Sequence, residues 1–259
     1  MQRISNPRTL VLLIVLVIGL SVVSNLLRGP AGEAEEPDVA EEITPQVVFA
    51  VGPLEVTSTV INTWAMMLLL GVAAYLIGRN LKLRPGMVQN MLEWIVEAIE
   101  KLIREMVGVE DATMFLPVVG TLAFFIGTAN LIGLLPGLKS PTPDINTPLS
   151  MALVVFFSVP YFGIRTRGLW AYLKHYVEPI FLMLPIEIAS EIARTFSLTF
   201  RLFGNIMGEE IIISILFIVM PLFVPVPMML FSIFTGLLQA YIFTLLTCVY
   251  IGGAVKAHQ

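Results

Sequence analysis

The chain has 259 residues, of which 57% are hydrophobic and 13% are charged, with a formal net charge of −4. A soluble domain usually carries about a quarter charged residues, so this composition excludes an ordinary soluble domain and indicates a membrane protein. The sequence contains no P-loop, G-x-G-x-x-G or H-E-x-x-H motif, and its single cysteine is Cys248. We therefore expect no nucleotide site, disulfide, metal, cofactor or nucleic-acid partner for this chain by itself.

The N-terminal segment begins with an apolar run, Leu10–Leu27, which is either a signal peptide or a retained first helix. The run is long for a signal peptide and no clear A-x-A cleavage site follows it, which favours a retained helix. We divide the chain into an N-terminal apolar span (residues 1–28), an acidic external arm (29–57) and a membrane domain (58–259). The arm contains seven acidic residues and no basic residue, which predicts a solvated, poorly ordered segment.

The membrane domain is predicted to contain five further spans and one amphipathic helix. The amphipathic helix, Met87–Val107, has an apolar and a charged face, so we expect it to lie in the membrane interface. The predicted spans are Trp64–Gly78, Met114–Leu135, Leu149–Gly163, Pro179–Met220 and Pro227–Val255. The predicted fold class is an all-α membrane protein with six spans, or five if the first is removed.

The distribution of lysine and arginine predicts the orientation of these spans. If the N-terminus lies inside, six alternating spans leave the C-terminus inside, in the cytoplasm. The basic residues that then lie inside are Arg3, Arg8, Arg79, Lys82, Arg84, Lys101, Arg104, Arg165, Arg167, Lys174 and Lys256. Only Arg28 and Lys139 lie outside, as the positive-inside rule requires. The remaining two, Arg194 and Arg201, lie within the fifth span.

The fifth span, Pro179–Met220, is unusual because it carries six charged residues, although one charge at membrane depth costs about 3 kcal/mol. A helix turns by about 100° per residue, which places its polar residues within roughly 40° of one line. This predicted polar stripe contains Glu187, Glu191, Arg194, Arg201, Asn205 and Glu209. Such a stripe must face protein or water rather than lipid.

The length of the fifth span, about 63 Å if it is helical throughout, is twice the thickness of the hydrocarbon layer. We therefore expect the helix to tilt strongly, to bend near Gly204 and Gly208, or to extend beyond the bilayer. The last span, Pro227–Val255, is also long. Two long oblique helices of this kind suit packing against a broad, curved partner.

Arg201 differs from Arg194 in its neighbours along the helix. Arg194 has glutamates three and seven residues before it, so an internal salt bridge accounts for its charge. The residues three and four positions from Arg201 are Ser197, Leu198, Gly204 and Asn205, none of them acidic. Arg201 is therefore predicted to be a membrane-buried cation without a counter-ion from its own chain. The amides of Gln239 and Asn130 are explained by hydrogen bonds between helices or by a role in an ion pathway.

Several sequence segments resemble subunit a of the F-type ATP synthases, and they occur in the order of that family. The matching segments are Asn130–Pro136 (NLIGLLP), Asp144–Leu153 (DINTPLSMAL), Arg201–Asn205 (RLFGN), Gly208–Glu209 and Leu238–Phe243 (LQAYIF). The resemblance covers roughly Thr57 to the C-terminus. The chain departs from some family members at Gly133, where they have an aspartate, and at Ser232, where some have a histidine that pairs with the outer acid.

The resemblance implies that Arg201 faces the ion-carrying carboxylate of a rotating ring of c subunits. It also implies two water-filled half-channels that reach this interface from opposite sides of the membrane. The implied inner half-channel contains Glu187 and Ser190, and the outer half-channel or the interface contains Asn205, Glu209 and Gln239. Asn130 is a further candidate for the ion pathway, and Glu191, Arg194 and Asp144 are secondary candidates.

The implied function is ion translocation by the a subunit of the membrane sector of a rotary ATP synthase, in the plasma or inner membrane of a bacterium. A proton is the expected ion, although that choice lies mainly in the ring. The implied partners are the c-ring, subunit b of the peripheral stalk, the remaining subunits of the membrane and soluble sectors, and lipid. By this reading the chain is not an enzyme by itself.

Two alternatives stay open at the level of sequence. A self-contained secondary transporter would require internal repeats or broken helices at corresponding places in two halves of the chain, and the sequence shows neither. A purely structural membrane anchor predicts that Arg201 can be neutralised without consequence.

Overall fold

The computed structural model describes residues 47–51, 54–79, 81–84, 86–133, 140, 142–172, 183–219 and 225–256. Its elements are β1 (Val47–Val51), β2 (Leu54–Thr57), α3 (Ser58–Arg79), α4 (Met87–Val107), α5 (Leu116–Ile132), α6 (Asn146–Arg167), α8 (Met183–Val219) and α9 (Pro225–Lys256). The membrane domain is all-helical, as predicted. The N-terminal span predicted within residues 1–28 lies outside the described residues.

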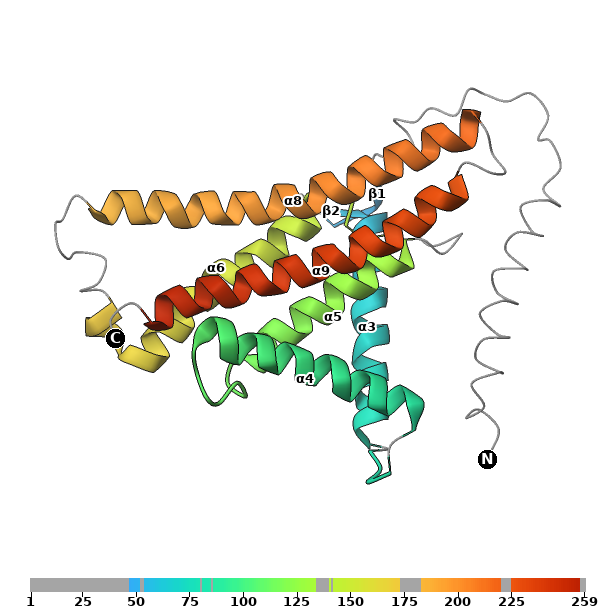
Figure 1. Ribbon diagram of the computed structural model, residues 1–259. Helices are drawn as coiled ribbons and strands as arrows, with labels where there is room; N and C mark the ends of the chain where they lie inside the picture. The colour runs from blue at the N-terminus through green and yellow to red at the C-terminus, as the bar shows by residue number, and fades with distance from the viewer. Residues whose placement is uncertain are drawn as a thin grey trace.

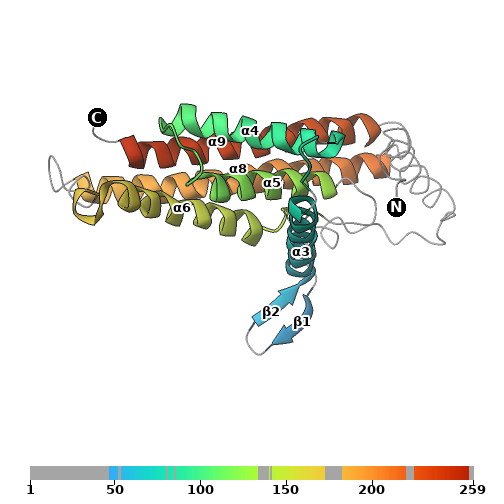
Figure 2. The same cartoon turned by 90° about the horizontal axis from the view of Figure 1, so that it is seen from below.

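The five helices from α4 to α9 form a bundle in which α9 is central, because α4, α5, α6 and α8 all pack against it. Figure 1 shows α8 and α9 running side by side, with α5 and α6 beside them. In Figure 2, α4 lies along α9 and α3 projects from the bundle, with the two strands at its far end. The bundle therefore buries α9 on several sides and leaves one side of α8 uncovered by the described residues.

Close helix contacts explain why glycines occur at two positions of α9. A Cβ atom at Gly236 would lie 2.9 Å from the Cβ atom of Asn130 on α5. A Cβ atom at Gly252 would lie 2.6 Å from the carbonyl oxygen of Met106 on α4. Small residues allow helices to approach closely and gain dispersion energy. Phe243 and Ile251 of α9 are fully buried in the core formed at these contacts.

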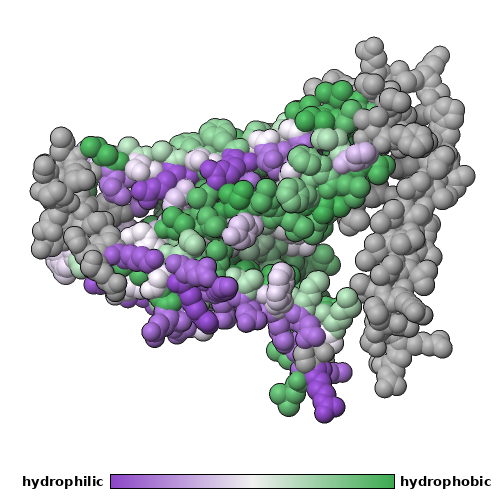
Figure 3. All heavy atoms as spheres, viewed as in Figure 1, coloured by the Kyte–Doolittle hydropathy of each residue, from purple (hydrophilic) through white to green (hydrophobic). Residues whose placement is uncertain are grey.

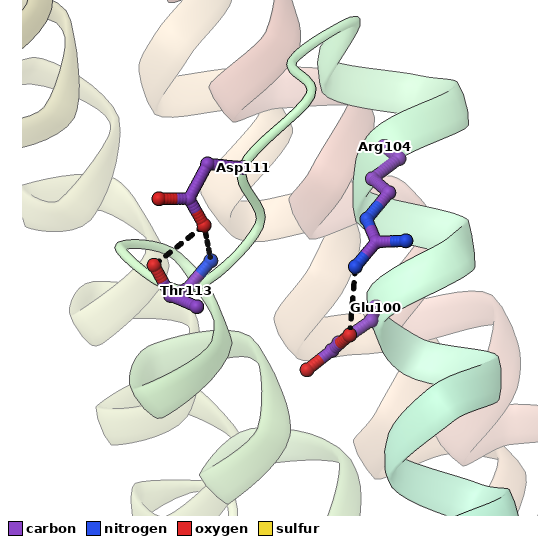
Figure 4. A network of polar contacts seen from close by, with 4 residues as sticks. All are labelled: Glu100, Arg104, Asp111 and Thr113. Atoms are coloured by element: carbon purple, nitrogen blue, oxygen red, sulfur yellow. Dashed lines mark hydrogen bonds and ion pairs between the residues drawn. The ribbon is translucent and has the colours of Figure 1, made fainter.

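Helix α4 has the bounds that its amphipathic pattern predicted. Its apolar face is buried against the bundle through Ile99, Leu102, Ile103 and Val107. Its polar face carries the ion pair between Arg104 and Glu100, 2.9 Å apart (Figure 4). Gly108 ends the helix with φ of 75°, a backbone conformation that glycine adopts without strain. The helix is confirmed, while its position in the membrane interface stays a prediction.

The connection after α4 is ordered by the carboxylate of Asp111. This carboxylate accepts hydrogen bonds from the hydroxyl and the backbone N–H of Thr113, at 2.6 and 2.9 Å (Figure 4). Both bonds favour the ionised form, and they hold the pKa of the Asp111 carboxyl below its ordinary value of 3.8. The Asp111 side chain thus closes a turn that leads into α5.

Three of the described helices are long and apolar enough to cross a membrane: Ser58–Arg79, Asn146–Arg167 and Val226–Lys256. Helix α5 is also apolar but has only 17 residues. Helix α3 buries only Met66 against the described residues, so its apolar surface is open to lipid or to a partner. The presence of helices long and apolar enough to span a membrane is confirmed, whereas the total of six spans and the tilt of α8 and α9 stay predictions.

A short antiparallel hairpin at the end of the acidic arm was not predicted. Strands β1 and β2 pair with Val47 opposite Thr57 and Val51 opposite Leu54. The sequence VVFAV of β1 is rich in valine, which favours extended structure, and Gly52 and Pro53 stand between the strands. The acidic composition of the whole arm predicted a poorly ordered segment, so this local strand pattern was not recognised.

Candidate ion pathway

Helix α8 presents the predicted polar stripe along a continuous helix. It runs from Met183 to Val219 without a break at Gly204 or Gly208 and is about 55 Å long. Leu198, Leu202 and Ile206 are buried and attach α8 to the bundle. Figure 3 shows a band of hydrophilic residues along α8 beside a broad hydrophobic surface. The stripe is therefore anchored by apolar residues next to it.

Arg201 is exposed on the surface of the chain, although Leu202 beside it is fully buried. Its side chain makes neither a hydrogen bond nor an ion pair with any of the residues that the structure describes. The absence of an acidic partner, predicted from the neighbouring positions, thus holds for the described part of the chain. Because Arg201 is exposed, another molecule can reach it.

The part of the stripe toward the N-terminus of α8 forms a polar cluster around Arg194. The guanidinium of Arg194 lies 3.6 Å from a carboxylate oxygen of Glu187 and donates a hydrogen bond of 3.2 Å to the hydroxyl of Ser190. It also lies over the ring of Tyr250 on α9, 5.6 Å from the ring centre, at a distance typical of a cation–π contact. The predicted salt bridge of Arg194 is confirmed, with Glu187 as its partner.

This cluster lines a cleft between α6, α8 and α9 that has two adjacent hollows with shared lining residues. The wider hollow is lined by Val159, Tyr172, Glu187, Glu191, Arg194, Tyr250, Gly253 and Ala254. The narrower hollow is lined by Val155, Phe156, Val159, Glu191, Arg194, Thr195, Leu198 and Tyr250. The cleft thus extends along α8 from Glu187 to Leu198, one helical turn before Arg201.

A second polar cluster lies further along α8, beyond Arg201. Glu209 accepts a hydrogen bond of 2.5 Å from the hydroxyl of Thr235 on α9. Asn205, between Arg201 and Glu209, is partly buried. Along α9, Thr235 is 15 residues, or about 22 Å, from Tyr250 of the first cluster. The two clusters are therefore separated along the helices, with Arg201 between them.

The amides predicted on α5 and α9 lie near this second cluster. Asn130 is buried and donates a hydrogen bond of 3.0 Å to the carbonyl oxygen of Gly236, and it accepts one of 3.5 Å from Thr142. Gln239 is also buried, and its amide nitrogen has no partner among the described residues. The same holds for the hydroxyl of Ser232, seven residues earlier on the same face of α9.

Asp144 has a structural role in the described part of the chain. Its carboxylate accepts a hydrogen bond of 2.6 Å from Thr59 at the start of α3 and one of 3.0 Å from the backbone N–H of Asn146. The second bond satisfies a backbone donor at the start of α6, as a helix cap does. Asp144 therefore links α3 to α6 rather than lining either cluster.

The structure thus brings most of the predicted site residues into two groups. The first contains Glu187, Ser190, Glu191 and Arg194, and the second contains Glu209, with Asn130 and Gln239 on the neighbouring helices. Sequence reasoning missed Tyr250 and Thr235. Tyr250 lies 11 residues after Gln239 and so on the same face of α9, but its contact with Arg194 depends on how α9 is placed against α8.

Comparison with known proteins identifies the family to which the chain belongs. The sequence profile of the family described as ATP synthase A chain matches residues 60–252. The chain is 47% identical to ATP synthase subunit a 2 of Bradyrhizobium sp. strain BTAi1, over 82% of this chain and 95% of that protein. It is 45% identical to ATP synthase subunit a 2 of Pelobacter propionicus, over 83% of this chain and 93% of that protein. It is 39% identical to ATP synthase subunit a of Moorella thermoacetica, over 83% of this chain and 99% of that protein. The chain therefore belongs to the ATP synthase A chain family.

Proposed function

We propose that this chain carries ions, expected to be protons, between the two faces of a bacterial cell membrane and a c-ring of the membrane sector of a rotary ATP synthase. The observation that carries this proposal is Arg201, an exposed arginine in the middle of a long helix, without an acidic partner among the described residues. A charge at membrane depth costs at least about 3 kcal/mol unless it is compensated. In the proposed complex, a carboxylate on the neighbouring c-ring compensates the positive charge of Arg201.

The surface beside Arg201 supports contact with a moving partner. Ala193, Ser197 and Gly204 are exposed and lie within about 80° of Arg201 around the helix axis. A Cβ atom added at Gly204 would meet nothing within 4 Å. Small side chains allow another helix to approach the backbone of α8 closely. The small residues at these three positions give a ring helix room to approach α8 beside Arg201.

The two polar clusters supply the two half-channels of the proposal. The cleft extends along α8 from Glu187 to Leu198, one helical turn before Arg201. We assign it to the cytoplasmic side, where the positive-inside rule places that end of the bundle. Glu209 with Thr235 belongs to the opposite side. The buried polar atoms of Ser232 and Gln239 suit a path that contains water, because buried polar groups require a partner.

The proposed cycle follows from this arrangement. An ion that enters by one half-channel neutralises a ring carboxylate, which can then turn into lipid at little cost. After nearly a full turn the site meets the other half-channel and releases the ion. Arg201 holds the ionised carboxylate and repels a passing cation, so it prevents a direct leak between the half-channels. The c-ring, subunit b and the remaining subunits of the complex are separate proteins, and their association with this chain is part of the proposal.

Replacement of Arg201 by alanine tests the proposal. In inverted membrane vesicles that contain the complete complex, we expect Arg201→Ala to abolish ATP-driven ion pumping, measured in parallel for protons and for Na⁺, while the chain stays inserted. Lys82→Ala removes an exposed cation outside both clusters and is expected to leave pumping unchanged. Pumping by Arg201→Ala at half the wild-type rate or more contradicts the mechanism and favours a structural anchor.

A further inference from the structure

Asn130 on α5 differs from Gln239, the other amide predicted for the ion pathway, because the protein already satisfies its side chain. Its nitrogen donates a hydrogen bond of 3.0 Å to the carbonyl oxygen of Gly236 on α9, and its oxygen accepts one of 3.5 Å from the hydroxyl of Thr142. The amide nitrogen of Gln239 is also buried, but it has no partner among the described residues. Gln239 therefore lacks an acceptor that water can supply, whereas Asn130 does not.

Helices α5 and α9 approach each other closely around Asn130. A Cβ atom added at Gly127 would lie 3.8 Å from the Cβ atom of Ala240, and one added at Gly236 would lie 2.9 Å from that of Asn130. The fully buried side chains nearby on the two helices are Ile126, Ala129 and Phe243. The two helices thus meet through small and apolar residues, and the amide of Asn130 joins them.

The connection that precedes α6 is fastened over the same place. The buried hydroxyl of Ser140 donates a hydrogen bond of 3.1 Å to the carbonyl oxygen of Ala129 and lies 2.5 Å from the hydroxyl of Thr142. A Cβ atom at Gly133 would lie 2.6 Å from the Cβ atom of Ser140, so the connection lies directly against the end of α5. Thr142 itself is fully buried and meets Asn130 from this side.

Positions around α9 show which side of this helix needs water. At about 100° per residue, Ser232 and Gln239 lie roughly 40° and 60° from Gly236, on the side toward Thr235. Gly236 meets α5, whereas Thr235 meets α8, where it donates to Glu209. The unpartnered polar atoms of Ser232 and Gln239 therefore lie between the contact with α5 and the contact with α8.

We propose that Asn130 seals the outer half-channel on the side of α5, so that the outer path runs along the side of α9 that faces α8. The proposal rests on the proposed function, because it assigns a boundary to the outer half-channel. Asn130 is then a positioning residue, which holds α9 against α5 and does not bind the ion. Truncation of its side chain would leave a cavity beside the carbonyl of Gly236 and the hydroxyl of Thr142, and a cavity lined by polar groups admits water.

The test measures water access on the two sides of the seal. It uses the complete complex in right-side-out vesicles, a Cys248→Ser background and trimethylammonioethyl methanethiosulfonate, a membrane-impermeant thiol reagent. Ser232→Cys reports on the outer path, and Ala240→Cys, buried next to Gly127, reports on the space behind the seal. We expect Ser232→Cys to react at least about tenfold faster than Ala240→Cys. Asn130→Ala should raise the rate at Ala240→Cys about tenfold, because a lost buried hydrogen bond makes local opening more frequent.

Matched controls separate a seal from ordinary packing. Ile126 is fully buried one turn before Asn130 on the same face of α5, and Ile126→Ala leaves an apolar cavity, which stays dry. This variant should leave the rate at Ala240→Cys unchanged. Cys248 is fully buried on α9, about 18 Å from Gly236, so as the only cysteine it reports general loosening and should stay unreactive in Asn130→Ala.

A second pair of variants keeps the test possible if Asn130→Ala does not assemble. Thr142→Val removes the hydroxyl that meets the amide oxygen of Asn130, and Thr142→Ser retains it. We expect Thr142→Val to speed the labelling of Ala240→Cys and Thr142→Ser to keep the slow rate.

The outcomes distinguish failure of the seal from failure of the outer half-channel. If Ile126→Ala speeds the labelling of Ala240→Cys as much as Asn130→Ala does, or if Cys248 becomes reactive as well, the residue only supports packing and the seal is wrong. The seal is also wrong if Ala240→Cys reacts as fast as Ser232→Cys while Asn130 is intact. If Ser232→Cys does not react, although Ile145→Cys at the exposed start of α6 does, the outer half-channel itself is wrong, and the seal with it.

Discussion

At the scale of single residues, Arg201 and Arg194 show what a sequence can predict about charges on a helix. The lack of an acid three or four positions from Arg201 predicted its isolation, because only these positions share a helix face at close range. For Arg194 the sequence offered two acids on the same stripe, Glu191 three positions before it and Glu187 seven positions before it. The structure places a carboxylate oxygen of Glu187 3.6 Å from the guanidinium of Arg194, which also contacts Ser190 and Tyr250.

Thr235 is a residue that sequence reasoning could not assign, since its role depends on a contact between two helices. Its hydroxyl donates to Glu209, and a typical hydrogen bond makes a net contribution of about 0.5–1.5 kcal/mol. We expect Thr235→Val to slow ion pumping by roughly three- to tenfold, less than Glu209→Gln does. Thr235→Ser keeps the hydroxyl and serves as the control. Pumping by Thr235→Val at the wild-type rate would show that Glu209 does not need this donor.

At the scale of elements, the periodicity of α4 gave its bounds, whereas the start of α9 was placed two residues too late. The density of prolines between residues 221 and 227 predicted a turn up to Pro227. The helix begins at Pro225, because proline lacks only an N–H group that the first turn of a helix leaves unpaired. The close packing of α9 against α5 and α4 was not predictable from sequence, because it depends on which helices Gly236 and Gly252 contact.

The contact of α9 with α4 makes a prediction about stability. A methyl group at Gly252 would meet the backbone of Met106 and Val107, at 2.6 and 3.1 Å, which cannot move away as a flexible side chain can. We expect Gly252→Ala to lower stability by about 1–3 kcal/mol, measured as a lower melting temperature of the purified complex. At Gly253 a Cβ atom meets nothing within 4 Å, so Gly253→Ala is the matched control. Equal melting temperatures for both variants would refute the close contact.

The turn before α5 makes a prediction about pH. The pKa of the Asp111 carboxyl is lowered, so its contribution to the turn is complete above pH 3.8 and is lost as the pH falls below that value. We expect protection of the Thr113 amide from hydrogen exchange, corrected for the intrinsic rate, to decrease as the pH falls through this range. In Asp111→Asn the residual protection should not depend on pH. A flat profile in the unmodified protein would show that the carboxylate does not hold the turn.

At the scale of the whole molecule, the separation of the two polar clusters predicts access from opposite faces of the membrane. In a Cys248→Ser background, we expect Glu187→Cys to react with a membrane-impermeant thiol reagent from the cytoplasmic face and Glu209→Cys from the opposite face. Glu187 lines the wider hollow of the cleft, while Glu209 lies beyond Arg201 near Thr235. Reaction of both cysteines from the same face would exclude two half-channels.

The surface that the bundle leaves uncovered predicts where the partner binds. Ser197 lies one helical turn before Arg201 and is exposed, whereas the next residue, Leu198, is buried against the bundle. The sequence alone did not separate these two positions, because both lie within one turn of Arg201. Only the packing of α8 shows which of them faces outward.

Disulfide trapping uses this pair of neighbouring residues. We expect Ser197→Cys to form a crosslink with a cysteine placed one turn from the carboxylate of a c subunit, and with several copies of that subunit as the ring turns. Leu198→Cys should crosslink poorly, because the core covers its side chain. If Ser197→Cys in an active complex crosslinks to a subunit outside the ring and never to the ring, then α8 faces another partner. Arg201 then requires a different counter-ion, and a self-contained transporter becomes the better explanation of its charge.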